Sequence, residues 1–342
     1  MKTHFEVLNQ RLLSSLDKTY PVGLAHGKMG LCIYFYQLSR LEHHSPYQSV
    51  AEEMLDQIIE NGLSFNQSIN VEEGLAGIGL GLIYLVKEKF VEGDINELLE
   101  DFDNTIFRKL AFLENKTNYS PEELLHLIYY LYCRMIDQPD ENSRYPFQQL
   151  IIKVFNLFYA NLTDEFLNES ISFSVYHYQL PLFLWVTAKL LEQNFYSDRI
   201  YKVLDEMRLT IQSRFPVLHS NRLYLLWGLL SLTAYLKDRF WHQYIQMLYK
   251  EISLDEIFRY EMKDRHIFIS NGIAMVYILL EAINNNYPDY RIEYDPKYFY
   301  NRIIQSDAWN ALMEREYFYN IHRGLLNGFP GAYLILLKIR NG

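Results

Sequence analysis

The sequence Gly-Leu-Ala-His-Gly-Lys-Met-Gly at residues 23–30 decides how the rest of the chain is organised. Its glycines occupy the first, fifth and eighth positions, and an apolar run follows at residues 31–38. The same spacing returns near the C-terminus as Gly-Leu-Leu-Asn-Gly-Phe-Pro-Gly at residues 324–331, again before an apolar run. A spacing that recurs in distant stretches indicates internal repeats, and repeats determine the fold as a whole.

Five further stretches align to the second glycine of this frame, Gly27. Four aligned copies besides the first carry a glycine there, at positions 74, 228, 272 and 328. The third and fourth copies, aligned at positions 127 and 178, are placed mainly by spacing. The chain therefore contains seven copies at intervals of about fifty residues.

Each copy opens an apolar run that predicts a helix buried on nearly all sides. Between these inner helices lie amphipathic ones with apolar residues at three-and-four spacing. The alternation predicts one all-α domain over residues 1–342, an α/α toroid or double barrel of seven helix pairs. An open solenoid is the main alternative, but it would leave one face of the apolar inner helices in water. The outer helices are expected at residues 3–16, 45–61, 95–114, 146–162, 198–213, 240–262 and 297–315.

Composition narrows the classes of function. The net charge of −10 argues against a nucleic-acid partner, because phosphate binding needs a basic surface. Two cysteines in 342 residues exclude a disulfide framework and suit the cytoplasm. The N-terminus has no apolar signal-peptide core. Residues 170–188 carry no formal charge, but we interpret them as a buried helix with its lead-in rather than a membrane span.

The glycine motifs at residues 23–30, 74–79 and 324–331, in seven copies, resemble the lanthionine synthetase C-like (LanC-like) proteins along essentially the whole chain. The resemblance implies a seven-fold α/α double barrel. It also implies peptide modification, in which the family's cyclases add peptide cysteine thiols to dehydrated serine or threonine. In those enzymes a zinc ion lowers the thiol pKa and holds the thiolate. A peptide substrate or a peptide-modifying enzyme is the partner that the resemblance implies.

This sequence departs from the family at the zinc ligands. The family supplies them from a Trp-Cys-x-Gly motif in the fifth copy and a Cys-His-Gly motif in the sixth. Here Leu226 stands at the first cysteine position, and Ser270 and Asn271 replace the Cys-His pair. Leucine cannot ligate a metal, and serine and neutral asparagine are poor zinc ligands. We therefore expect no metal and no other cofactor, unless unexpected residues supply the ligands.

Two polar residues do match the resemblance. His177 precedes the aligned position of the fourth copy, where the cyclases carry a mechanistic histidine. Arg222 lies four residues before Leu226, as an arginine does before the family's zinc-binding cysteine. Two interpretations of function follow: a non-catalytic LanC-like subunit that binds a peptide or an enzyme, and a divergent zinc-independent enzyme that uses His177 and Arg222 as catalytic residues.

The residue immediately before each aligned position is polar in six of the seven copies. If each precedes an inner helix, these side chains would gather at one end of the barrel, where helix N-termini favour anions. A ligand or peptide site there is one interpretation; capping of the local helices is the other. We call these seven the helix-start residues: His26, Glu73, His126, His177, Trp227, Asn271 and Asn327.

Two further chemistries receive less support. The three histidines among the helix-start residues belong to copies one, three and four, which are not all neighbours, so a histidine metal site is disfavoured. An α/α-barrel glycoside-processing enzyme would need two carboxylates across a cleft. Glu72 and Glu73 would supply one, but only Glu261 or Asp264 offers a partner, and neither lies in a matching motif.

Overall fold

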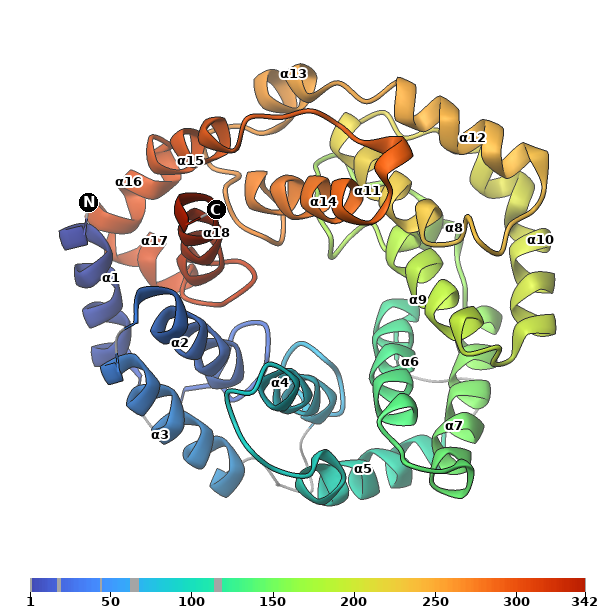
Figure 1. The fold of residues 1–342 in the computed structure, drawn as a ribbon, viewed down its shortest axis with the longest axis horizontal. Helices are drawn as coiled ribbons and strands as arrows, with labels where there is room; N and C mark the ends of the chain where they lie inside the picture. The colour runs from blue at the N-terminus through green and yellow to red at the C-terminus, as the bar shows by residue number, and fades with distance from the viewer. Residues whose placement is uncertain (1, 17–19, 44, 62–67, 114–118, 342) are drawn as a thin grey trace. The chain divides into compact units, whose positions relative to one another are not determined.

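The computed structural model describes residues 2–16, 20–43, 45–61, 68–113 and 119–341, and these residues contain helices and loops but no strand. The elements are labelled in Figure 1. No helix in this part of the chain combines the length and apolarity needed to cross a membrane. The uncharged run at residues 170–188 instead leads into a buried helix, as expected.

The seven predicted inner helices are all present, and most of their side chains are buried. In α4, for example, Leu75, Ile78, Leu82 and Leu85 are buried along successive turns. A helix that is apolar on every face can keep its side chains away from water only inside the protein, which is why the sequence pattern predicts these helices well. They are α2 (Lys28–Glu42), α4 (Leu75–Lys87), α6 (Pro121–Ile136), α9 (Leu180–Glu192), α11 (His219–Leu230), α14 (Ile273–Asn286) and α18 (Phe329–Asn341).

Amphipathic helices alternate with the inner ones. Two of the predicted outer helices are interrupted where a serine caps a new helix: Ser253 accepts a hydrogen bond from the backbone of Glu256, and Ser306 from that of Trp309. The fourth begins five residues before its predicted start at 146, because Asp140 accepts from the Ser143 backbone. The outer helices are α1 (Lys2–Ser15), α3 (Ser45–Asn61), α5 (Ile95–Ala111), α7 (Glu141–Ala160), α10 (Ser197–Ser213), α12 (Arg239–Lys250), α13 (Leu254–Glu256), α15 (Pro296–Ile304) and α16 (Asp307–Glu314), with the short α8 (Asp164–Leu167) and α17 (Glu316–Ile321) beside them.

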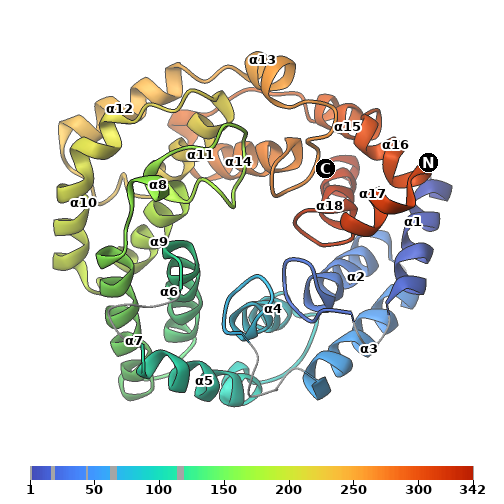
Figure 2. The ribbon, with the colours of Figure 1, turned by 180° about the vertical axis from the view of Figure 1, so that it is seen from behind.

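The chain divides into two compact units. The first comprises residues 1–160 and 303–342, and the second residues 161–302. In the first, α2 packs against α3, α4 and α18, so the two ends of the sequence lie together, as Figures 1 and 2 show. In the second, α11 packs against α9 and α14. A single domain over residues 1–342 stays a prediction.

One charged pair lies inside the first unit. The Arg134 guanidinium on α6 donates from Nε to an Asp103 carboxylate oxygen on α5 over 2.9 Å. The Tyr130 hydroxyl donates to the other oxygen over 2.6 Å, and Asn96 accepts from Arg134 over 3.0 Å. Arg134 is 1% exposed and Asp103 6%. Burial raises the pKa of the Asp103 carboxyl above its ordinary value, and the hydrogen bonds from Arg134 and Tyr130 offset only part of this rise.

Candidate functional site

The glycine frame places the loop of one copy directly on the loop of the next. Before α2, the Ala25 backbone N–H donates to the carbonyl of Glu72 over 2.9 Å. A Cβ at Gly23 would overlap the backbone of Glu73, which lies in the loop before α4. Only glycine allows such a close approach of two backbones. The first glycine of the frame is therefore a contact between copies.

The last copy repeats this contact with the first. A Cβ at Gly324 would lie 2.7 Å from the carbonyl oxygen of Ala25. Beside it, His26 Nδ1 and Asn327 Oδ1 are 2.8 Å apart, a hydrogen-bond distance. The loops of copies seven, one and two are thus connected in that order. Three helix-start residues lie on these connected loops: Asn327 before α18, His26 before α2 and Glu73 before α4.

Glu72 is the carboxylate with the perturbed environment in this cluster. Its side chain is half-buried, whereas the neighbouring Glu73 is exposed. Burial raises the pKa of the Glu72 carboxyl, the charge of His26 lowers it, and the negative charges of Glu73 and Glu123 raise it further. A carboxyl with a raised pKa beside a histidine suits proton transfer or a hydrogen bond to a ligand.

His322, in the same loop region, gives a prediction about pH. Its Nδ1 donates to the carbonyl of Asn327 over 2.7 Å, and burial lowers its pKa below the ordinary 6.5. The folded state therefore binds a proton less readily than the unfolded state. The contribution of neutral His322 to stability is complete above pH 6.5 and is lost as the pH falls through the lower folded value.

We therefore expect urea denaturation to show less loss of unfolding free energy between pH 7.5 and 5.0 in His322→Asn than in the wild type. The Asn amide can replace the Nδ1 donor but does not titrate. The matched control is His43→Asn, at an exposed position with left-handed backbone that asparagine tolerates. Raised carboxyl pKa values, such as that of Glu72, act in the opposite sense, so the difference between variants is the readout. Equal pH dependence in both variants would contradict the prediction.

His126 differs from the expectation that it precedes an inner helix. It lies in the second turn of α6, which begins at Pro121. Ser120 and Glu123 form a reciprocal capping box there, so the helix starts where the caps are rather than at the spacing of the repeats. Glu123 is also a carboxylate that acts on Glu72, but its side chain accepts the Ser120 backbone N–H over 2.9 Å.

In the second unit, His177 and Asn271 lie on neighbouring loops. The Val175 backbone N–H donates to the Ser270 carbonyl over 2.9 Å, joining the turn before α9 to the loop before α14. His177 is exposed, and within the described residues its imidazole has no hydrogen-bond partner. The Asn271 Oδ1 atom is buried and accepts no hydrogen bond from any described residue. A buried acceptor without a donor is costly unless a ligand or water supplies one.

Trp227 also differs from the expectation, because it lies in the third turn of α11 rather than before its start. A Cβ at the next residue, Gly228, would lie 2.5 Å from the carbonyl of Pro181 on α9. That glycine therefore serves a helix–helix contact, unlike Gly27 or Gly272, each of which is a helix N-cap.

The indole of Trp227 belongs to an aromatic stack. Its ring lies 5.6 Å from that of Trp185 on α9, at an interplanar angle of 20°, and 5.8 Å from that of Tyr224. Tyr224 is buried, whereas both tryptophans are half-buried. The repeats do not single out Trp185, because it sits inside an apolar run. Stacked indoles that remain partly open offer a contact surface for an apolar side chain.

Arg222 is occupied by backbone contacts. Its Nε donates to the Pro216 carbonyl over 2.7 Å, its Nη2 to Val217 over 3.0 Å, and its Nη1 to Glu251 over 2.9 Å. These bonds fix the loop before α11 and the end of α12. His177 and Arg222 are both in the second unit, and no described contact joins their side chains.

The positions that the resemblance assigns to zinc do not fit the ion. The Leu226 side chain is apolar and 0% exposed, and Ser270 is 3% exposed. Asn271 offers a single amide oxygen, which is a poor ligand beside thiolate or imidazole. Among the described residues, no group of three His, Cys, Asp or Glu side chains is placed to hold a metal ion. The two cysteines, Cys32 and Cys133, are buried, and burial raises the pKa of the Cys133 thiol to about 11.

No protein-family model matches the sequence, and no curated protein matches it either. Among solved structures, the chain is similar to nisin cyclase, with a TM-score of 0.59 and 15% sequence identity. The match covers 99% of this chain and 93% of that protein. A likeness at this identity shows the fold alone. It confirms the all-α toroid predicted from the seven repeats.

Proposed function

We propose that this chain is a LanC-like protein of peptide modification that works without a zinc centre and binds a peptide or a peptide-modifying enzyme. The observation that carries the proposal is the donor set at the aligned zinc positions, a buried leucine, a buried serine and an asparagine, on a fold similar to that of nisin cyclase. A cyclase of that kind needs a metal-activated thiolate, and these residues do not supply the ligands. Buried free cysteines suit the cytoplasm as its location.

Two features support binding of a peptide. The stack of Trp185 and Trp227 leaves parts of two indoles open, and aromatic surfaces of this kind recur where proteins hold side chains. The Asn271 Oδ1 atom is a buried acceptor that a peptide N–H would satisfy. Exposed His177, on the neighbouring loop, adds a donor or acceptor.

The test uses a synthetic peptide that carries one cysteine and one dehydroalanine. Addition of the thiol to the alkene leaves the mass unchanged, so ring closure is followed by counting free thiols after alkylation. We expect saturable binding, seen as a change in tryptophan fluorescence, with the thiol still free and no zinc in the purified protein by elemental analysis. About one zinc per chain, or loss of the free thiol, would overturn the proposal.

Variants locate the peptide site. Removing an indole with Trp227→Ala should weaken peptide binding about tenfold, the value of one good aromatic contact. The matched control, Tyr201→Ala, removes an exposed ring on α10 and should leave the affinity unchanged. The alignment itself is tested by Leu226→Cys, Ser270→Cys and Asn271→His combined, which should bind about one zinc per chain if these positions correspond to the family's ligands.

A second candidate is a divergent enzyme that uses His177 and Arg222 without zinc. The open imidazole of His177 favours it, because a general base needs a free nitrogen. The three backbone carbonyls bound by Arg222 weigh against it. If thiol loss is observed without metal, His177→Ala should abolish it. Unchanged thiol loss in that variant would eliminate this candidate.

A further inference from the structure

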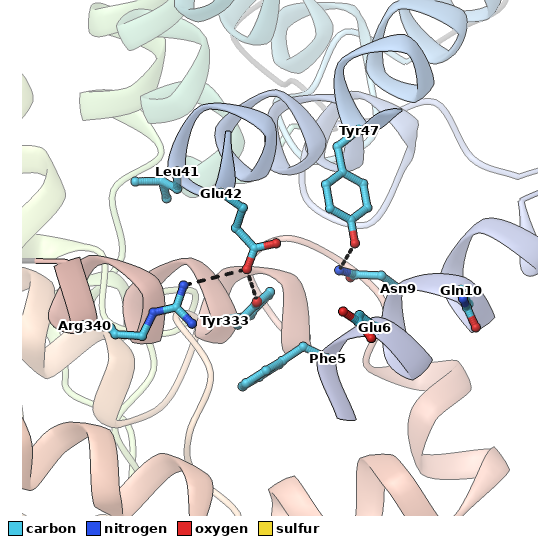
Figure 3. Close-up of a pocket in the computed structure, with 9 residues that line it drawn as sticks. All are labelled: Phe5, Glu6, Asn9, Gln10, Leu41, Glu42, Tyr47, Tyr333 and Arg340. Carbon is cyan, nitrogen blue, oxygen red and sulfur yellow. Dashed lines mark hydrogen bonds and ion pairs between the residues drawn. The ribbon is translucent and has the colours of Figure 1, made fainter. Parts of the chain in front are cut away.

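A polar cavity of about 540 Å³ lies at the opposite end of α2 from the loops described above. It is formed by α1, the start of α3, the C-terminal end of α2, and α18 from Tyr333 to Arg340 (Figure 3). Because α2 has 15 residues and each adds about 1.5 Å, the cavity and the glycine loops are roughly 22 Å apart along that helix. It is therefore a separate site, and nothing in the proposed function uses it.

Two carboxylates from different helices line this cavity. Glu42, the last residue of α2, accepts the Tyr333 hydroxyl over 2.7 Å and lies 3.8 Å from an Arg340 nitrogen, both through Oε1. Among the described residues, none donates a hydrogen bond to its second oxygen, and none forms a hydrogen bond or ion pair with the carboxylate of Glu6, which is exposed on α1. Figure 3 shows both side chains at the cavity wall. The cavity thus has acceptors that the protein does not fill.

The electrostatic balance favours a cation. Two carboxylates face one guanidinium, and the Arg340 side chain is 43% exposed and already directed to Glu42. The helices α2 and α18 both end here, and a helix C-terminus carries partial negative charge. The pKa of the Tyr47 phenol is raised by burial first, and by the charges of both Glu42 and Glu6, so both carboxylates act on the same space. An anionic ligand would face net repulsion.

The remaining walls fit a short apolar stem. Phe5 and Tyr333 stack with ring centroids 4.0 Å apart, and Leu41 lies beside Glu42. Asn9 is 2% exposed and already accepts from Tyr34 and donates to Tyr47, so it holds the wall rather than the ligand. A methylene chain against these side chains with its charged end at the carboxylates would match the lining.

We propose that this cavity binds an alkylammonium group, either a lysine side chain of a peptide or a small free diamine. The ammonium donates hydrogen bonds to Glu6 and to the second oxygen of Glu42, and the methylene stem lies along Phe5 and Leu41. Because Glu6 belongs to α1 and Glu42 to α2, the ligand connects the first helix of the chain to its neighbour. Binding is therefore expected to raise the melting temperature as well.

Calorimetric titration of the full chain tests the site with 1,5-diaminopentane and its neutral counterpart 1,5-pentanediol. We expect the diamine to bind at one saturable site and the diol not to bind. Glu6→Gln and Glu42→Gln should each weaken binding about tenfold, because each removes a charge-assisted hydrogen bond. The Gln side chain can still accept from Tyr333, and circular dichroism with the melting temperature of the unliganded variants checks that they fold.

The matched control, Glu100→Gln, makes the same charge change at an exposed position of α5 and should leave the affinity unchanged. Equal weakening by the control would mean general attraction to an acidic protein and would overturn the proposal. The proposal would also be overturned if the diol, or a neutral disaccharide titrated in the same way, bound as tightly as the diamine. A glycine peptide with one lysine, compared with its acetyl-lysine form, identifies the source. Tighter binding of the lysine peptide than of the diamine assigns the site to peptides, and the reverse assigns it to free amines.

Discussion

Replacing Arg134 by methionine is expected to lower the free energy of unfolding by about 3 to 5 kcal/mol. The substitution leaves Asp103 in the space between α5 and α6 with its charge unpaired, and among the described residues only Tyr130 still donates to it. Removing one partner of a buried ion pair costs far more than the pair itself contributes, because the remaining charge has no water. Urea denaturation followed by circular dichroism measures the loss.

The second half of this test removes the other charge as well. The double variant Arg134→Met with Asp103→Leu should be more stable than Arg134→Met alone by about 2 kcal/mol, although Tyr130 then loses its acceptor. The control, Arg259→Met, also breaks an ion pair, but its partner Asp255 is exposed. It should change the free energy of unfolding by less than about 1 kcal/mol. A double variant less stable than the single one would show that the pair is held for its hydrogen bonds rather than for charge balance.

The variant Gly77→Ala is expected to lower the free energy of unfolding by about 3 kcal/mol, at the upper end of the range for overpacking. Its Cβ would overlap the carbonyl oxygen of Val71, which is backbone and cannot move aside without shifting the loop before α4. Gly77 occupies the eighth position of the glycine frame, as Gly30 does in the first copy. Urea denaturation of this variant thus tests whether a glycine is needed at this position of the frame for close packing.

Gly81→Ala is the matched control in the same helix. Its Cβ would lie 2.5 Å from atoms of the Met29 side chain, a flexible thioether that can change rotamer. Alanine also favours a helix interior over glycine by about 1 kcal/mol, which offsets the crowding. We expect a net change within about 1 kcal/mol. Similar losses at both glycines would contradict the role of the Val71 carbonyl.

The all-α fold and the inner helices could be predicted because their signal is local. A run such as residues 273–280 is apolar on every face, so it must be buried whatever its neighbours are. The glycine frame was equally informative, since Gly27, Gly74 and Gly272 are the N-caps of three inner helices. Repeats add evidence from copy to copy, and a single helix cannot.

The site could be predicted only in part. His26 and Asn327 lie within hydrogen-bond distance of each other. His126 and Trp227 lie within helices instead, because spacing does not reveal a capping box or a glycine used for helix contact. Trp185 was hidden by the apolar run around it. The cavity proposed for an amine depends on Glu6 and Glu42 lining the same space, which no periodicity indicates.

The contact between the loop before α18 and the loop before α2 has a consequence for synthesis on the ribosome. The first unit needs residues 303–342, whereas the second is one continuous stretch, residues 161–302. The second unit can therefore complete its core before residues 303–342 have left the ribosome. Until Gly324 reaches Ala25, the side of α2 that α18 covers stays open to water and to other nascent chains. Chains that are stopped before residue 324 are expected to aggregate more than chains that include residues 303–342.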